Sequence, residues 1–200
     1  MAGDGTYPDR KLVQKVISGD RAAFGRLARS EIGRLIKLAQ RLLNSTSEAE
    51  DAVQDALASV WLARRRLDPA RPIGPFLTTT TLNKCRDRLR RRKLTGFWGQ
   101  HTPLDELNLP DNGPDPETSA IDRDALRSLQ REIERLPVRL REALVLVVID
   151  GRSHDEAAHL LGVSEKAVET RIYRARKRLR EKPRFFEGRA SQLRIPRHEP

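Results

Sequence analysis

The sequence predicts an all-α protein made of two small helical domains joined by a flexible linker, the second domain containing a helix-turn-helix. Apolar residues keep helical spacing along most of the 200 residues, and no alternating run indicates a strand. A segment rich in Pro, Gly, Asn and Asp interrupts this spacing at 95–119. Two short helical patterns near the C-terminus are separated by a tight turn that contains glycine.

The charge of the chain narrows its possible partners. There are 39 Lys and Arg residues against 28 Asp and Glu, a formal net charge of +11. Such an excess favours a nucleic-acid partner or an anionic membrane surface. The single cysteine, Cys85, excludes an internal disulfide and a cysteine-based zinc site. No stretch of roughly 18 apolar residues is present, so we expect a cytoplasmic protein without membrane insertion. We also expect no cofactor.

The N-terminal part begins with two predicted helices. Residues 9–18 form a short helix that ends at Gly19. Asp20 can accept hydrogen bonds from the first turn of the next helix, whose apolar residues continue to Leu43. Gly33 is a point at which this helix could be interrupted.

Two more helices follow in the same half. Ser47 and Glu50 have the spacing of a capping box, which opens a helix that ends before Pro69. The turn "DPARPIGP" separates it from a helix over 76–93. The first of these helices buries one apolar stripe, and its opposite face changes from acidic to apolar, which suggests docking to a protein. The residues of that face are Asp51, Gln54, Asp55, Ala58 and Leu62.

The second half resumes helical spacing after the acidic linker. A helix is predicted over 120–136, and Pro137 fits the first turn of the next one. The run "LVLVVI" at 144–149 could be a buried strand on its residues alone. The helical spacing that precedes it, stopped by Gly151, favours a buried helix instead.

The last two helices form the predicted helix-turn-helix. Ser153 and Glu156 make a second capping box, Gly162 supplies the left-handed residue that ends this helix, and Ser164 can cap the next. A recognition helix enters the major groove by its N-terminal end. The candidates for base contacts are therefore Lys166, Glu169, Thr170, Arg171 and Arg174, and those for phosphate contacts are Arg176, Lys177, Arg178 and Arg180.

Two alternatives apply to this region. A charged helix is often only a solvated face, although the turn in front of this one makes that reading less favourable. A metal site in "HDEAAH" is rejected, because His154 and His159 lie about 140° apart around a helix.

Four segments together resemble the extracytoplasmic-function (ECF) sigma factors of bacterial RNA polymerase. They are "GDRAAFGRL", "SEAEDAVQDALASVW", "NKCRDRLRRRK" and the long stretch from "LPVRLREALVLVV" to "RKRLRE". The resemblance covers sigma region 2 at 9–94 and region 4 at 118–182, with a linker at 95–117 and an unassigned tail at 183–200.

The resemblance implies a role for each half. Region 2 would dock on the β′ clamp helices of core polymerase through the acidic-apolar face and would melt the −10 element. Region 4 would bind the −35 element and the β flap, and an anti-sigma factor would be a further partner. The residues matched to the −10 contacts are Asp68, Arg71, Ile73, Gly74, Asn83, Lys84, Arg86, Arg88, Arg90 and Arg91.

The chain departs from the family pattern at two places. Phe76 and the threonines of Thr78–Thr81 replace a segment that usually contains tryptophan, and Glu169 stands where lysine is common. A stand-alone helix-turn-helix repressor or activator is the alternative function, but it leaves the docking face without a use. An enzyme is not expected, because no paired catalytic carboxylates, nucleophile–base pair or phosphate loop has a recognisable spacing.

Overall fold

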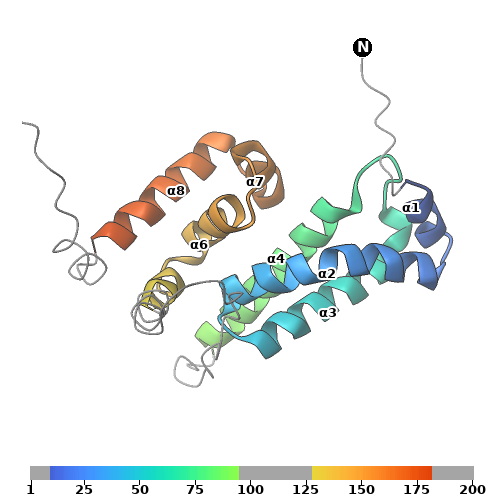
Figure 1. Ribbon diagram of the computed structural model, residues 1–200, viewed down its shortest axis with the longest axis horizontal. Coiled ribbons are helices and arrows are strands. Elements are labelled where there is room, and N and C mark those ends of the chain that lie inside the picture. Colours follow the sequence, from blue (N-terminus) through green and yellow to red (C-terminus); the bar gives the residue numbers. More distant parts are fainter. Residues whose placement is uncertain (1–9, 95–127, 182–200) are drawn as a thin grey trace, which may run out of the picture.

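The computed structural model describes residues 10–94 and 128–181, and the regular structure within them is entirely helical. Figure 1 shows two groups of helices lying side by side, one formed by α1 to α4 and the other ending in α8. The predicted fold class is confirmed. The linker at 95–117, the first part of the helix predicted at 120–136 and the tail at 183–200 lie outside the described residues.

The first group contains α1 (Arg10–Ile17), α2 (Arg21–Leu43), α3 (Thr46–Leu62) and α4 (Ile73–Leu94). Asp20 caps α2 as predicted, its side chain accepting a hydrogen bond from the amide of Ala23 at 3.0 Å. The helix runs through Gly33 without a break and ends at Asn44, which has a left-handed φ of 53°.

Two predicted boundaries in this group are wrong. Ser45, not Ser47, is the N-cap of α3, and its hydroxyl accepts from the amide of Glu48 at 3.3 Å. Helix α3 ends at Leu62 and is followed by a short 3₁₀ turn, η1 (Arg64–Arg66). Helix α4 begins at Ile73, three residues before the predicted start.

The second group contains a helix over 128–134, α6 (Val138–Leu144), the π-helical turn η2 (Val145–Ile149), α7 (His154–Leu161) and α8 (Glu165–Arg180). The prediction of helix for "LVLVVI" is confirmed in kind, since Leu144 ends α6 and the next five residues form η2. Pro137 is the N-cap of α6 and not a residue of its first turn.

The two groups share one apolar core. Leu35 and Leu77 of the first group belong to the same buried cluster as Leu146 and Val168 of the second, and all four are completely buried. A smaller cluster of Leu136, Leu140, Leu144 and Ala175 lies within the second group alone. The second group therefore packs directly on α2 and α4, in addition to the chain connection at 95–127.

Candidate nucleic-acid interface

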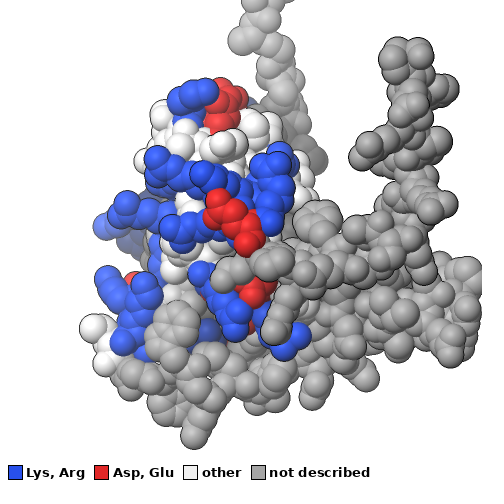
Figure 2. Space-filling model, turned by 90° about the vertical axis from the view of Figure 1, so that its left-hand side faces the viewer, with Lys and Arg blue, Asp and Glu red and all other residues white. Residues whose placement is uncertain are grey.

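Helix α8 has the two faces that its sequence predicts. Val168, Ile172 and Ala175 are buried, whereas Arg174 and Lys177 on the other side are exposed. The hydroxyl of Ser164 caps the helix by accepting from the amide of Ala167 at 3.2 Å. Figure 2 looks from the side on which α8 lies in Figure 1, and Lys and Arg cover most of the charged area there.

The turn in front of α8 is the predicted helix-turn-helix turn. Ser153 and Glu156 form the capping box of α7, with a bond of 2.9 Å from the Ser153 amide to the Glu156 carboxylate. This bond lowers the pKa of Glu156. Gly162 ends α7 with a φ of 65°, a value at which any other side chain would be strained. The turn thus presents the first residues of α8 to solvent.

The first candidate contacts on α8 are already paired with one another. The ammonium of Lys166 donates to the Glu169 carboxylate at 2.7 Å. The pKa of Glu169 is lowered and that of Lys166 is raised by this hydrogen bond. Thr170 donates its hydroxyl to the carbonyl of Lys166. The net positive charge of the free surface is therefore concentrated farther along, where Arg174, Arg176, Lys177, Arg178 and Arg180 are all exposed. Arg171 is half-buried.

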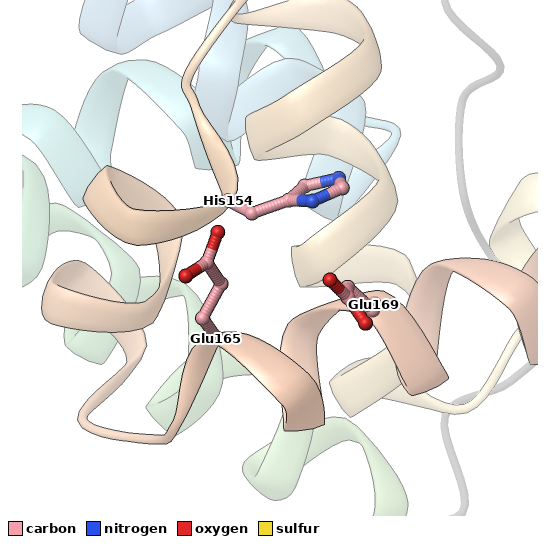
Figure 3. A group of neighbouring side chains, drawn as sticks. All are labelled: His154, Glu165 and Glu169. Carbon is pink, nitrogen blue, oxygen red and sulfur yellow. The ribbon is translucent and has the colours of Figure 1, made fainter.

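Glu169 also lies near a histidine that spacing within α7 could not connect to it. One ligand atom each from His154, Glu165 and Glu169 lies within 4.8 Å of the others, and Figure 3 shows the three side chains converging from the starts of α7 and α8. His159, the other member of "HDEAAH", is exposed and not part of this group. Glu165 is exposed to water, and Glu169 forms an ion pair with Lys166. These surface interactions are enough to explain why the three side chains lie close together.

A cavity of about 750 Å³ lies at the loop between η1 and α4. Its lining includes Asp68, Arg71 and Phe76, and His159 of the second group closes one side. Arg71 pairs with Asp68 at 3.4 Å and both remain exposed. Ile73 also borders the cavity but is only 4% exposed, so its side chain belongs mainly to the core.

Gly74 is a position of close approach and not an open contact. A Cβ atom at this residue would lie 3.1 Å from a carboxylate oxygen of Glu31 on α2. A side chain at this position would therefore require the Glu31 carboxylate to shift by a few tenths of an ångström.

The arginines of α4 are largely engaged in pairs. Arg88 donates to Asp55 of α3 at 2.8 Å, and Arg90 donates to Asp87 at 3.0 Å. Arg86 donates to Asn83 at 2.8 Å and to both oxygens of Glu142. Arg90, Arg91 and Asn83 are exposed, and Lys84 is half-buried. The structure thus places the candidate −10 residues from Asn83 to Arg91 on one helix. Their side chains differ in how far they are exposed to a DNA strand.

The predicted docking face of α3 is exposed throughout. Leu62 is 79% exposed, although it is a large apolar side chain. Asp51, Gln54, Asp55 and Ala58 are also exposed, while Val53 and Val60 on the opposite side are buried. This face is thus exposed to solvent, with Asp55 held by Arg88 of α4.

Sequence reasoning missed two buried charged residues of α6. Arg141 is 5% exposed and donates to the carbonyls of Leu42 at 2.6 Å and Leu136 at 3.2 Å. Burial lowers its pKa. Glu142 is 3% exposed and is bound by Arg86. Leu42 and Arg86, which hold Arg141 and Glu142 against the first group, lie 99 and 56 residues away in the sequence, so no local pattern could have shown these contacts.

Membrane insertion has no support in the described helices. Across residues 10–94 and 128–181, every helix is too short or too polar to cross a bilayer.

Comparison with known proteins assigns each half of the chain to a protein family model. The family model for sigma-70 region 2 matches residues 27–95, and that for sigma-70 region 4 matches residues 126–179. The ECF RNA polymerase sigma factor SigM of Mycobacterium tuberculosis is 33% identical over 172 residues, which cover 86% of this chain and 82% of SigM.

Two solved structures are similar in fold. CnrH, in complex with the cytosolic domain of CnrY, has a TM-score of 0.62 and 31% identity, covering 86% of this chain and 95% of CnrH. The sigma factor RpoE from Bartonella quintana, in complex with the anti-sigma factor NepR, has a TM-score of 0.61 and 23% identity, covering 79% and 94%. Matches to both regions, in this order and over most of each relative, lead to one conclusion. The chain belongs to the ECF sigma factors, which direct promoter-specific transcription initiation by bacterial RNA polymerase.

Proposed function

We propose that α8 is the −35 recognition helix of this sigma factor. The observation that supports this most is the two-sided character of α8. Its apolar stripe is fixed in the core, and exposed cations occupy the opposite face from Arg174 onward, in the helix that follows the tight turn at Gly162. This is the arrangement with which a helix-turn-helix enters the major groove. Arg174 would contact a base, and Lys177 and Arg178 would contact phosphates.

The loop over 68–74 and the start of α4 form the proposed −10 site. The cavity beside Asp68 and Arg71 is large enough for a base turned out of the duplex, and Phe76 offers an apolar wall. The exposed cations of α4 would then follow the phosphates of the single strand. Because unpaired bases are recognised one at a time, the loop determines the preferred base at one position of the −10 element.

The exposed face of α3 is the proposed contact with the β′ clamp helices of core polymerase. A patch that combines a carboxylate with an exposed leucine fits a protein partner better than DNA, which would be repelled by Asp51. The second half would contact the β flap. An anti-sigma factor is a further proposed partner, by analogy with the RpoE complex. The protein would act in the cytoplasm with the polymerase, and the polymerase would supply the catalytic residues.

The test combines core RNA polymerase, the purified protein and fragmented genomic DNA, followed by sequencing of transcript 5′ ends. We expect the start sites to share two short elements at the spacing of −35 and −10. Exchanging residues 68–74 for the loop of another ECF sigma factor should alter one base of the −10 element and leave the −35 element unchanged. Unaltered start sites would contradict the proposed role of this loop.

The alternative of a stand-alone helix-turn-helix regulator predicts a different outcome. Such a protein would bind DNA through α8 but would not confer start sites on core polymerase. Start sites that are identical with and without the protein would favour it.

A further inference from the structure

We propose that His154, Glu165 and Glu169 form a binding site for a divalent transition-metal ion at the turn between α7 and α8. A bound ion would join the first turns of these two helices. The site itself rests only on the three side chains and on the turn that holds them. Its effect on DNA binding also rests on the proposed role of α8 at the −35 element.

The three side chains offer a mixed set of nitrogen and oxygen donors. Their closeness does not require an ion, but one ligand atom of each lies within 4.8 Å of the other two (Figure 3). Donor atoms around a tetrahedral Zn²⁺ lie about 3.4 Å apart, because each is about 2.0–2.2 Å from the ion. Rotations about the side-chain bonds of the two glutamates cover the difference. An imidazole combined with carboxylates favours Zn²⁺ and similar ions over Mg²⁺ and Ca²⁺, which prefer oxygen ligands alone.

The two carboxylates come from one face of α8. Glu165 and Glu169 are four residues apart, which is the spacing at which two side chains of a helix bind one ion together. Like charges at this spacing repel each other and destabilise a helix. The bond of 2.7 Å from Lys166 to Glu169 relieves part of this repulsion, but within residues 10–94 and 128–181 no cation pairs with Glu165. A metal ion between the two carboxylates would remove the remainder.

The histidine reaches the carboxylates because the turn is fixed on both sides. His154 is the first residue of α7 and follows the N-cap Ser153, and Glu165 is the first residue of α8 and follows the N-cap Ser164. The two serine hydroxyls accept hydrogen bonds from backbone amides at 3.1 and 3.2 Å. The backbone positions of the ligands are therefore set before an ion arrives, which reduces the entropy lost on binding.

Binding of an ion would change the charge of the end of α8 that the proposed function places in the groove. Residues 165–170 contain two carboxylates and one ammonium, so this segment is negative on balance. Such a segment repels DNA phosphates, and a dication reverses its sign. The ion would also compete with Lys166 for Glu169 and so make the ammonium more available to DNA. Metal and promoter DNA should therefore each strengthen the binding of the other.

The first experiment measures Zn²⁺ binding to the full chain by isothermal titration calorimetry. His154→Gln removes the nitrogen ligand and keeps a polar side chain. We expect it to weaken the tightest Zn²⁺ binding by about tenfold or more, since one of three protein ligands is lost. His159→Gln is the matched control, because it removes a histidine of the same helix that lies outside the group. Equal Zn²⁺ affinities of the two variants would overturn the proposal.

A second pair of variants tests the carboxylates. Glu169→Gln should also weaken Zn²⁺ binding by about tenfold. Glu181→Gln should not, although it too removes one negative charge and one ion pair with a lysine, here Lys177 at 3.9 Å. An equal loss in both variants would indicate a general effect of charge and would also overturn the site.

Affinity for DNA is then measured by fluorescence anisotropy on a duplex that carries the −35 element found from the transcript start sites. Zn²⁺ is added at a concentration that saturates the native chain but not His154→Gln. If the start of α8 lies in the groove, Zn²⁺ should tighten binding of the native chain by about tenfold and leave that of His154→Gln unchanged. Zn²⁺ binding that requires His154 without any change in DNA affinity would support the metal site and would instead contradict the proposed position of α8 on the DNA.

Discussion

At the scale of single residues, we expect Arg174 to contact a base and Lys177 to contact a phosphate. Both are exposed on the same side of α8. Arg174→Ala should weaken binding to the −35 element by about 1–3 kcal/mol and relax the preference at one base position. Lys177→Ala should weaken binding to every sequence and lower the salt slope by about 0.9. Fluorescence anisotropy against a library of −35 duplexes at several salt concentrations measures both effects.

Each of these variants serves as the control of the other, since each removes one positive charge. A loss of affinity that is uniform over all sequences in both variants would contradict the assignment of Arg174 to a base contact and of Lys177 to a phosphate contact. The helical period places Arg174 and Lys177 on the exposed face of α8, so this part of the site could be predicted from the sequence. The Lys166–Glu169 pair could be suspected from spacing alone, but which partner each residue prefers depends on the fold.

Cys85 gives a prediction about pH. Burial in the core between α3 and α4 raises the pKa of this thiol from 9.0 to about 12. The folded state thus favours the neutral thiol, whose stabilising effect is complete below the unfolded pKa and is lost as the pH rises toward the folded value. Between about pH 8 and about pH 10.5, the native chain should lose about 2 kcal/mol more stability than Cys85→Ala. Urea unfolding of both proteins at the two pH values measures the difference, and parallel losses would show that the thiol ionises freely.

At the scale of elements, α3 provides the most direct test of polymerase docking. Asp51→Arg combined with Leu62→Ala alters only its exposed face, so the fold should be retained. We expect this variant to lose binding to core polymerase, because truncating a central interface residue commonly costs about 2 kcal/mol or more. Pull-down with core polymerase and promoter-dependent transcription measure the loss, and circular dichroism checks the helices.

A matched control lies on the same helix. Glu50 is also an exposed acidic residue, and it lies about 100° from Asp51 around the axis. Glu50→Arg should leave polymerase binding close to that of the native protein. Equal losses in the two variants would indicate a general effect of charge and not a defined contact.

The boundaries of elements show what local sequence can determine. The capping box of α7 and the left-handed Gly162 depend on residues three to nine positions apart, and both were predictable. The start of α3 was not, because Ser45 and Ser47 are both good caps and only packing selects one of them. The start of α4 was placed too late, because Gly74 and Pro75 are residues typical of turns but lie here in the first turn of the helix.

At the scale of the whole molecule, the shared core predicts that both groups of helices unfold together. Leu146 of η2 is completely buried in the cluster that also contains Leu35 of α2. Leu146→Ala should therefore destabilise the first group as well, by about 2–5 kcal/mol. Trp61 reports on that group, since its ring lies 5.4 Å from that of Phe24. In a Trp98→Phe background, its fluorescence and the circular dichroism should shift to the same lower urea midpoint.

Val148→Ala is the control for this prediction. Val148 is two residues from Leu146 but is 53% exposed, so its truncation should change stability little. A Trp61 midpoint that Leu146→Ala leaves unchanged would mean that the two groups unfold independently. The α-helices among residues 10–94 and 128–181 and their buried faces were predictable from the sequence, but this shared core was not. Apolar periodicity identifies which face of a helix is buried and does not identify what buries it.

The long sequence separation of the ion pairs Arg86–Glu142 and Arg34–Asp150 has a consequence for the newly made chain. Arg86 precedes Glu142 by 56 residues, and Arg34 precedes Asp150 by 116. Bacterial and eukaryotic ribosomes add about 5–20 residues per second, so Arg86 is made about 3–11 s before its partner exists. During that interval Arg34 and Arg86 have not yet met Asp150 and Glu142, whereas pairs within the first group, such as that of Arg88 with Asp55, can already form. The ion pairs and the shared core between the two groups can therefore form only once α6 and the residues behind it have left the ribosome.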